Sequence, residues 1–210
     1  MVDSMMEIVE GDLKFIFDKD ITVLNYDGKD SFYVKKFQKI LIDNEFKYEE
    51  AFKKICDANY QKKIFKKKLN QICPKSISAV DIVAYDKDTA YFIEVKDYRN
   101  PRSAEKNLHN LVLTVIKNCL DSYFGIIGMK FSKNSSEQII AKEIINKERI
   151  EFILHIEIPE NSDKFDREAW NLAGIQDLIE QRNSFSYRVR VVSKDNLPKS
   201  LPWVVKETQI

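Results

Sequence analysis

The chain has 210 residues, of which 44% are hydrophobic and 32% are charged, a composition that suits one soluble globular domain with a substantial core. Lys and Arg total 34 against 33 Asp and Glu, so the formal net charge of +1 excludes a histone-like polycation and an acidic disordered chain. Residues 44–150 hold 20 basic and 14 acidic side chains, which makes the middle of the chain its basic part.

The apolar runs and the cysteines of the chain indicate in which cellular compartment to expect it. The longest purely apolar runs fall far short of the roughly 20 residues that cross a bilayer, so we expect no membrane span and no membrane partner. The first residues lack a basic stretch followed by an apolar one, and we therefore expect a cytoplasmic protein. The three cysteines are far apart and only two histidines supplement them, which argues against a disulfide framework and a structural zinc site.

The first third of the chain predicts a hairpin followed by two helices. Alternating residues at 13–17 and 21–26, separated by 18–20, predict a β-hairpin that Asp27-Gly28 closes. Apolar spacing then predicts one helix from Ser31 and a second from near Glu45. Lysines crowd the far end of the second helix, where they form either a solvated face or a surface for nucleic acid.

The rest of the chain alternates between strands and helices. No repeat, low-complexity segment or Pro/Gly/Ser-rich linker divides it, so we expect a single domain over 1–210. Periodicity predicts, in order, strands at 78–85 and 89–96, an amphipathic helix at 108–120, a strand at 150–158, a helix at 166–180 and a strand at 187–192. This order indicates a mixed α/β fold.

The two strands at 78–85 and 89–96 carry the pattern most suggestive of chemistry. Side chains alternate along a strand, so Glu94 and Lys96 share one face. Either a two-residue turn at 87–88 or a four-residue loop at 86–89 gives the same register, in which Asp81 lies opposite Glu94. Like charges placed opposite each other are destabilising unless something compensates them, and a bound cation would do so.

An all-oxygen site of this kind suits magnesium. Two carboxylates with a nearby backbone carbonyl and water are ligands that Mg²⁺ prefers. Lys96 lies one strand step away, where its ammonium group could orient water or offset the charge on a phosphate.

The Asp81, Glu94-Val95-Lys96 arrangement resembles the PD-(D/E)XK nuclease superfamily, although Val80 stands where that family has proline. The resemblance implies a restriction-endonuclease-like central mixed β-sheet flanked by helices, with an N-terminal β-hairpin extension. It covers residues 45–160 as a nuclease-like core, which leaves 1–43 as a hairpin and helix extension and 161–210 as a C-terminal helix and strand addition.

By resemblance, Asp81, Glu94 and the Val95 carbonyl would bind Mg²⁺ or Mn²⁺, and Lys96 would activate water. Glu49 would be a further catalytic residue; we choose it over Glu45 and Glu50 because apolar residues three, six and seven positions later place it in line with the buried stripe. The implied function is a metal-dependent nuclease, a hydrolase of phosphodiester bonds in DNA.

Basic residues around this core would contact the phosphate backbone, which positions nucleic acid without reading its sequence. They are Arg99, Arg102, Lys62, Lys63 and Lys66. The expected partner is DNA, with RNA also allowed, and a homodimer would supply two sites for two strands. The competing hypothesis is a catalytically inactive binding or assembly module that keeps the nuclease-like fold.

Overall fold

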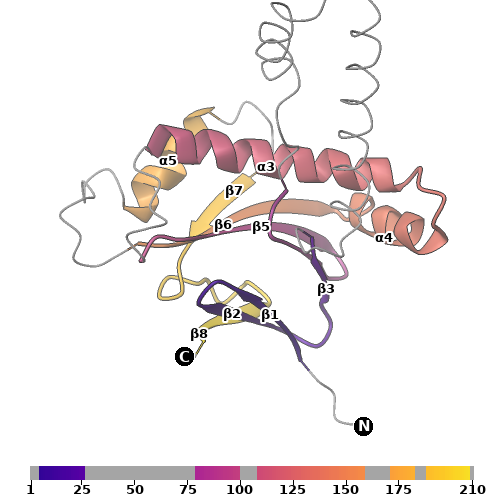
Figure 1. The fold of residues 1–210 in the computed structure, drawn as a ribbon, viewed down its shortest axis with the longest axis horizontal. Helices are drawn as coiled ribbons and strands as arrows, with labels where there is room; N and C mark the ends of the chain where they lie inside the picture. Colours follow the sequence, from indigo (N-terminus) through magenta and orange to yellow (C-terminus); the bar gives the residue numbers. More distant parts are fainter. Residues whose placement is uncertain (1–4, 27–78, 100–107, 159–170, 183–187, 209–210) are drawn as a thin grey trace, which may run out of the picture.

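The structure, a computed structural model, describes residues 5–26, 79–99, 108–158, 171–182 and 188–208. Within these ranges the protein is a mixed α/β structure with two sheets and three helices. Figure 1 shows three layers, in which helices cover one face of the larger sheet and the smaller sheet covers its other face. A hydrophobic core fills each of the two spaces between the layers.

The larger sheet has five strands and mixed direction. The first three strands in its order pair antiparallel and the last three pair parallel. Their order across the sheet is β3 (Thr22–Asn25), β4 (Ile82–Tyr85), β5 (Thr89–Asp97), β6 (Arg149–Glu157) and β7 (Arg188–Val192). Residues 90–94 of β5 and 152–157 of β6 are all buried, as expected for strands covered on both faces.

Three helices lie on one side of this sheet: α3 (Leu108–Met129), α4 (Ser135–Ile145) and α5 (Leu172–Arg182). The chain passes through α3 and α4 between the parallel strands β5 and β6. Asn134 caps α4, because its side chain accepts a hydrogen bond from the backbone N–H of Ser136.

Helix α3 departs from the expectation that no segment is long enough to cross a membrane. By length and composition alone it could span one, and 44% of its most apolar window is buried within the protein. Residues along one of its faces, including Leu111, Val112 and Val115, belong to the core above the larger sheet. This burial accounts for the apolar character of α3 without a bilayer.

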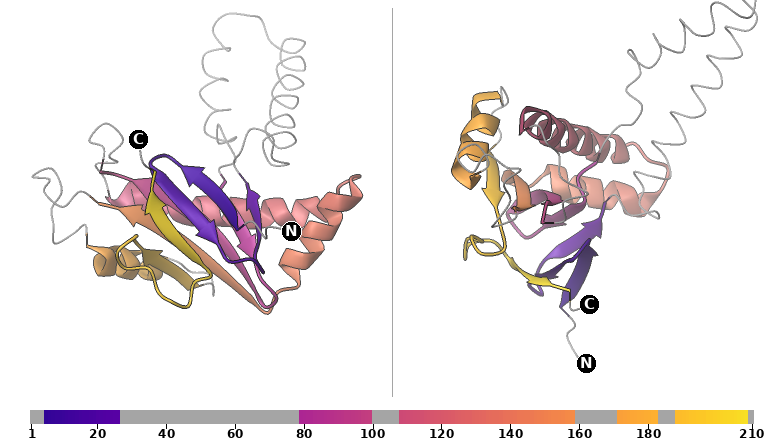
Figure 2. Two further views of the ribbon diagram at one scale, coloured as in Figure 1. Left: turned by 90° about the horizontal axis from the view of Figure 1, so that it is seen from below. Right: turned by 60° about the vertical axis from the view of Figure 1, so that its left-hand side comes forward.

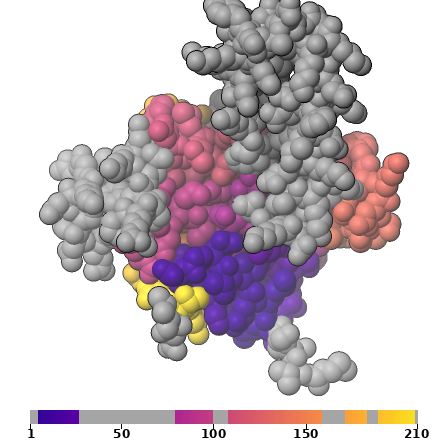
Figure 3. Space-filling model, in the orientation of Figure 1, coloured from indigo at the N-terminus to yellow at the C-terminus, as the bar shows by residue number. Residues whose placement is uncertain are grey.

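The smaller sheet has the order β1 (Met6–Glu10), β2 (Leu13–Phe17) and β8 (Trp203–Glu207), all antiparallel. Figure 2 shows β2 between strands from opposite ends of the chain, and Figure 3 shows the N-terminal strands at the molecular surface. Phe15, Phe17 and Trp203 turn inward and are at most 2% exposed. They pack against the face of the larger sheet that carries Ile82, Tyr91 and other core residues.

The predicted hairpin of 13–17 with 21–26 is wrong. Strand β2 pairs with β1 and β8, whereas β3 pairs with β4 in the other sheet. The hairpin that does form turns at Gly11, whose φ of 57° lies in the left-handed region that glycine enters without a steric cost. A backbone hydrogen bond from Ile21 N to Asp18 O then turns the chain toward the larger sheet.

Most other predicted elements are confirmed. The strands at 78–85 and 89–96 appear as β4 and β5, the amphipathic helix as the longer α3, and the later strands as β6 and β7. The helix predicted at 166–180 is described from Leu172 onward as α5. Strands β1 and β8 and helix α4 were not predicted. Both helices expected between Ser31 and the lysine-rich segment lie outside the described residues.

Candidate functional site

The candidate site forms where β4 begins beside the second half of β5. The pairs Ile82 with Ile93 and Tyr85 with Ala90 have the predicted register, which continues to place Asp81 opposite Glu94. The turn is held by Asp86, whose Oδ1 accepts hydrogen bonds from the backbone N–H groups of residues 88 and 89. Local turn chemistry and strand alternation together therefore position the two carboxyl groups.

Glu94 is buried beneath α3, with 1% of its surface exposed. Its Oε1 accepts a hydrogen bond from Asn118 Nδ2 at 2.9 Å and lies 2.5 Å from Lys96 Nζ. Its Oε2 is buried and has no hydrogen-bond partner among the described residues. A buried carboxylate oxygen without a donor is costly, so this atom marks a position that a cation or a water could fill.

Burial and charge set the protonation of the site. Burial raises the pKa of Glu94 to about 7; the Lys96 ammonium opposes this rise and the Asp81 carboxylate adds to it. Burial also raises the pKa of Asp81. For Lys96, burial acts to lower the pKa, but the attraction of Glu94 and Asp81 leaves it raised. Lys96 therefore keeps its positive charge at neutral pH.

Asp81 and Val95 join the strands where the backbone ladder stops. Val95 N donates to Asp81 Oδ2 at 2.6 Å, and Val80 N donates to Ser122 Oγ at 2.8 Å. In an antiparallel pair, the backbone N–H and C=O of one residue point toward the same neighbouring strand. The Val95 carbonyl therefore also faces the end of β4. Because the Val80 amide donates to Ser122, it is not the partner of that carbonyl.

These residues fit a hard divalent cation as a partial donor set. The register places the two carboxyl groups opposite each other, and the Val95 carbonyl faces the same end of β4. A cation bound there would favour the charged forms of both acids and so oppose the effect of burial on their pKa values. Among the described residues, no group of three or more His, Cys, Asp or Glu side chains is placed to hold a metal ion. A metal held by these two acids would keep several water ligands, as Mg²⁺ commonly does.

Two polar residues of α3 contribute to the site and were not predicted from the sequence. Asn118 and Ser122 lie four positions apart, hence on one helix face, and both are buried. Asn118 contacts Glu94, and Ser122 holds the amide of Val80. The signal was present as two polar residues that share the buried side of an otherwise apolar helix.

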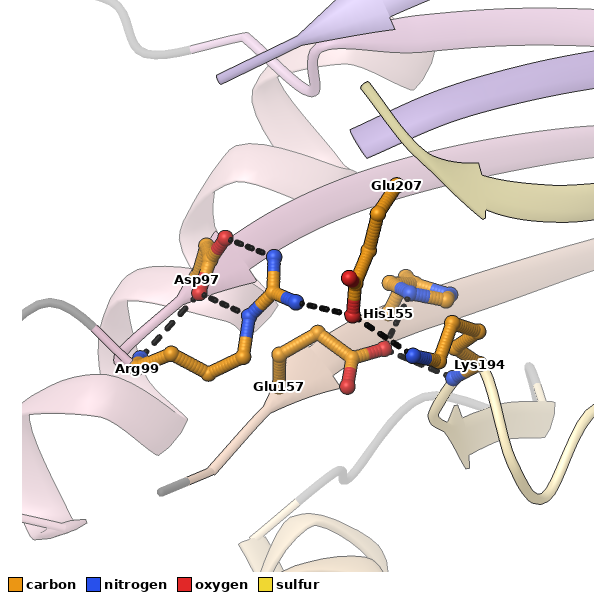
Figure 4. Close-up of polar contacts among 6 residues, drawn as sticks. All are labelled: Asp97, Arg99, His155, Glu157, Lys194 and Glu207. Carbon is orange, nitrogen blue, oxygen red and sulfur yellow. Dashed lines mark hydrogen bonds and ion pairs between the residues drawn. The ribbon is translucent and has the colours of Figure 1, made fainter. Parts of the chain in front are cut away.

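Arg99 lies on the other side of β5, in the ion network of Figure 4. Its guanidinium contacts Asp97 Oδ2 at 2.6 Å and Glu207 Oε1 at 2.7 Å. Glu157 in turn accepts hydrogen bonds from His155 Nε2 and from the backbone of residue 194, so the network links the ends of β5, β6 and β8. Arg99 is thus held between two carboxylates, and the structure does not bring it to Glu94.

The remaining predicted site residues lie outside the described part of the chain. They are Glu49, Lys62, Lys63, Lys66 and Arg102. Their assigned roles stay predictions.

Comparisons with known proteins give one relative. No family model matches the chain, and no solved structure matches it. The chain is 26% identical over 185 residues to the cysteine–tRNA ligase of Neisseria meningitidis serogroup A, serotype 4A. The similarity covers 81% of this chain but only 24% of the relative, so the chain spans about a quarter of that protein's length.

This relative corrects the functional prediction. The prediction was a metal-dependent nuclease that hydrolyses DNA, but the similar protein is a tRNA ligase, and nothing in the comparisons supports a nuclease or hydrolase. The predicted register of the two strands and the shared face of Glu94 and Lys96 are confirmed. The pattern of Asp and Glu-x-Lys did not identify the reaction, because one arrangement of carboxylates and lysine can serve different chemistries.

Proposed function

We propose that this chain acts in the attachment of amino acids to tRNA, as a domain that binds Mg²⁺ or Mn²⁺ and, through that ion, a phosphate group of tRNA. The observation that carries the proposal is the buried Glu94 carboxyl group: within the part of the chain that the structure describes, its Oε2 lacks a hydrogen-bond partner, and Lys96 lies beside the group. The tRNA component rests on the similarity to a cysteine–tRNA ligase.

The extent of the similarity favours an accessory domain of a ligase system. The chain spans 24% of the related protein's length. Its described residues nevertheless form two cores of their own. A domain with its own cores that works beside the catalytic part of a ligase accounts for both observations.

The chemistry of the site supports a phosphate ligand. A divalent ion at Asp81 and Glu94 would displace the proton that burial favours on Glu94, and it would present open coordination positions to a phosphate oxygen. Lys96 adds a fixed positive charge within 2.5 Å of Glu94. A cation and an ammonium group side by side suit a phosphodiester, which carries one negative charge.

A second part of this proposal concerns the kind of α/β fold that the larger sheet represents. We propose that the five-stranded sheet is of the restriction-endonuclease-like kind, in line with the resemblance of its motif. Support comes from Asp81 at the start of β4, from Glu94 and Lys96 on the adjacent β5, and from α3 packed over them. A shared fold does not carry an activity with it, so this assignment leaves the tRNA role unchanged.

Two titrations of the full chain test the function. Manganese binding is measured first by calorimetry, and binding of a cysteine-specific tRNA transcript is then measured with manganese or with EDTA. Glu94→Gln keeps the shape of the side chain but removes its charge. Glu148→Gln is the matched control, because Glu148 is exposed and distant in sequence from the site.

The expected result is tRNA binding that requires manganese, weakens at least tenfold in Glu94→Gln and is unchanged in Glu148→Gln. Equal affinity for the tRNA and for a DNA duplex of the same length would overturn the tRNA assignment. Binding that survives both EDTA and Glu94→Gln would overturn the assignment of the site.

A further inference from the structure

A second site lies on the face of β5 and β6 that is turned away from α3. It is a pocket of about 460 Å³ between the beginnings of these strands and the segment before β8. This volume lies in the range that small organic ligands occupy. The pocket is lined by Thr89, Tyr91, Arg149, Ile150, Glu151, Arg190, Ser200 and Leu201.

Two arginines dominate the polar lining. Arg149 donates from Nε to the hydroxyl oxygen of the buried Thr89 at 3.2 Å, and its two Nη atoms donate no hydrogen bond within the described part of the chain. Arg190 is held at one end by an ion pair of 3.1 Å with Glu151. Its other end reaches Ser200 Oγ only at 3.4 Å, the limit of a hydrogen bond.

This arrangement leaves donors for an anion. A guanidinium group presents its N–H donors in a planar fork that matches the two oxygens of a carboxylate or phosphate. Glu151 is the acid among the described lining residues, and Asp86, outside the lining, also interacts electrostatically with Arg149. Because Glu151 is already paired with Arg190, the unengaged end of Arg149 is the principal attraction for a ligand.

The remaining lining residues suit an apolar group attached to that anion. Leu201 supplies an aliphatic wall, and the Tyr91 ring lies nearly perpendicular to the Trp203 ring, with ring centroids 5.3 Å apart. The Tyr91 hydroxyl donates to Asp86 Oδ2 at 2.9 Å and adds no negative charge, since burial and Asp86 raise its pKa to about 12. Tyr91 therefore offers a neutral aromatic edge.

We propose that this pocket binds a small organic oxyanion, in which a phosphate monoester or carboxylate group contacts Arg149 and Arg190 and an apolar body lies against Tyr91 and Leu201. The proposal is independent of the tRNA role, because the pocket and Glu94 lie on opposite faces of β5. It therefore needs no metal ion.

Calorimetric titrations of the full chain in EDTA test the proposal with four probes: adenosine monophosphate, benzoate, adenosine and inorganic phosphate. The expected result is saturable binding of the monophosphate or of benzoate, with adenosine at least tenfold weaker because it lacks the anion. The monophosphate and benzoate arms decide between a phosphate and a carboxylate. Inorganic phosphate, which lacks the apolar body, is expected to bind more weakly than the monophosphate.

Substitution of Arg149 by glutamine should weaken the bound probe at least tenfold. Arg149 is exposed, so this change should leave the thermal unfolding midpoint unaltered. Arg182→Gln, at the exposed end of α5, is the matched control and should bind like the unmodified chain. Binding of no anionic probe, equal binding of adenosine, or equal binding by Arg149→Gln would each overturn the proposal.

Discussion

Replacement of Glu94 by glutamine should stabilise the metal-free protein at alkaline pH. The pKa of this buried carboxyl group is about 7 in the folded protein against 4.5 for the free side chain, chiefly because burial disfavours its charged form. A group whose pKa is raised on folding contributes stability that is complete below pH 4.5 and is lost as the pH rises through about 7.

The size of the effect follows from the two pKa values. At about 1.4 kcal/mol per pKa unit, a rise from 4.5 to about 7 corresponds to about 3 kcal/mol of unfolding free energy. Glutamine imitates the neutral acid at every pH. The variant should therefore exceed the unmodified chain by less than about 1 kcal/mol at pH 5 and by about 3 kcal/mol at pH 9, the latter being about 6 to 12 °C in unfolding midpoint for a domain of this size.

The assay is urea and thermal unfolding followed by circular dichroism in EDTA, between pH 5 and pH 9. The lowered pKa values of Asp86, Asp97 and Glu157 act below about pH 4.5, outside this interval. The exposed Glu148→Gln should leave the pH profile of the unmodified chain unchanged. If Glu94→Gln is less stable than the unmodified chain at pH 9, the account of Glu94 as a destabilised buried charge is wrong.

Three further substitutions test the framework around the site. Ser122→Ala should cost about 1 to 3 kcal/mol in urea unfolding, because the buried amide of Val80 loses its acceptor at 2.8 Å; a change below about 0.5 kcal/mol would contradict this. Phe15→Ala, in the core between the sheets, should cost about 3 to 5 kcal/mol, whereas truncation of the exposed Val9 on the neighbouring strand should cost far less. Glu157→Gln should cost about 1 kcal/mol or more at pH 7, and this cost should shrink as the pH falls below 4.5, because the pKa of Glu157 is lowered on folding and its contribution is lost as the folded acid is protonated; a cost that stays constant with pH would refute the electrostatic explanation.

The sequence predicts those parts of the site that depend on interactions between residues close together in the chain. The register of β4 and β5 follows from alternation and from the turn at Asp86, whose carboxylate accepts the N–H groups of the next residues. These interactions span only a few positions. For the same reason, the regular apolar spacing of α3 was sufficient to predict that helix.

Long-range pairing escaped prediction for a physical reason. The alternating pattern of β2 specifies which side chains face inward, but it does not specify a partner strand, and the partner β8 lies almost two hundred residues away in sequence. The sequence predicts that Glu94 and Lys96 share one face of a strand, but it does not predict which side chains cover that face. The structure places α3 over it, and only the tertiary packing reveals that Asn118 meets this carboxyl group.

A single strand builds both of the sites proposed above, because alternate residues of β5 face opposite layers. Glu94 lies under α3, whereas Thr89 and Tyr91 line the arginine pocket on the other face. The sheet itself lies between the two sites, so their free energies of binding should be nearly additive. Glu94→Gln should abolish the manganese signal and leave the oxyanion affinity within about twofold. Arg149→Gln should do the reverse, and a variant that loses both ligands while still unfolding cooperatively would show that the two faces are coupled.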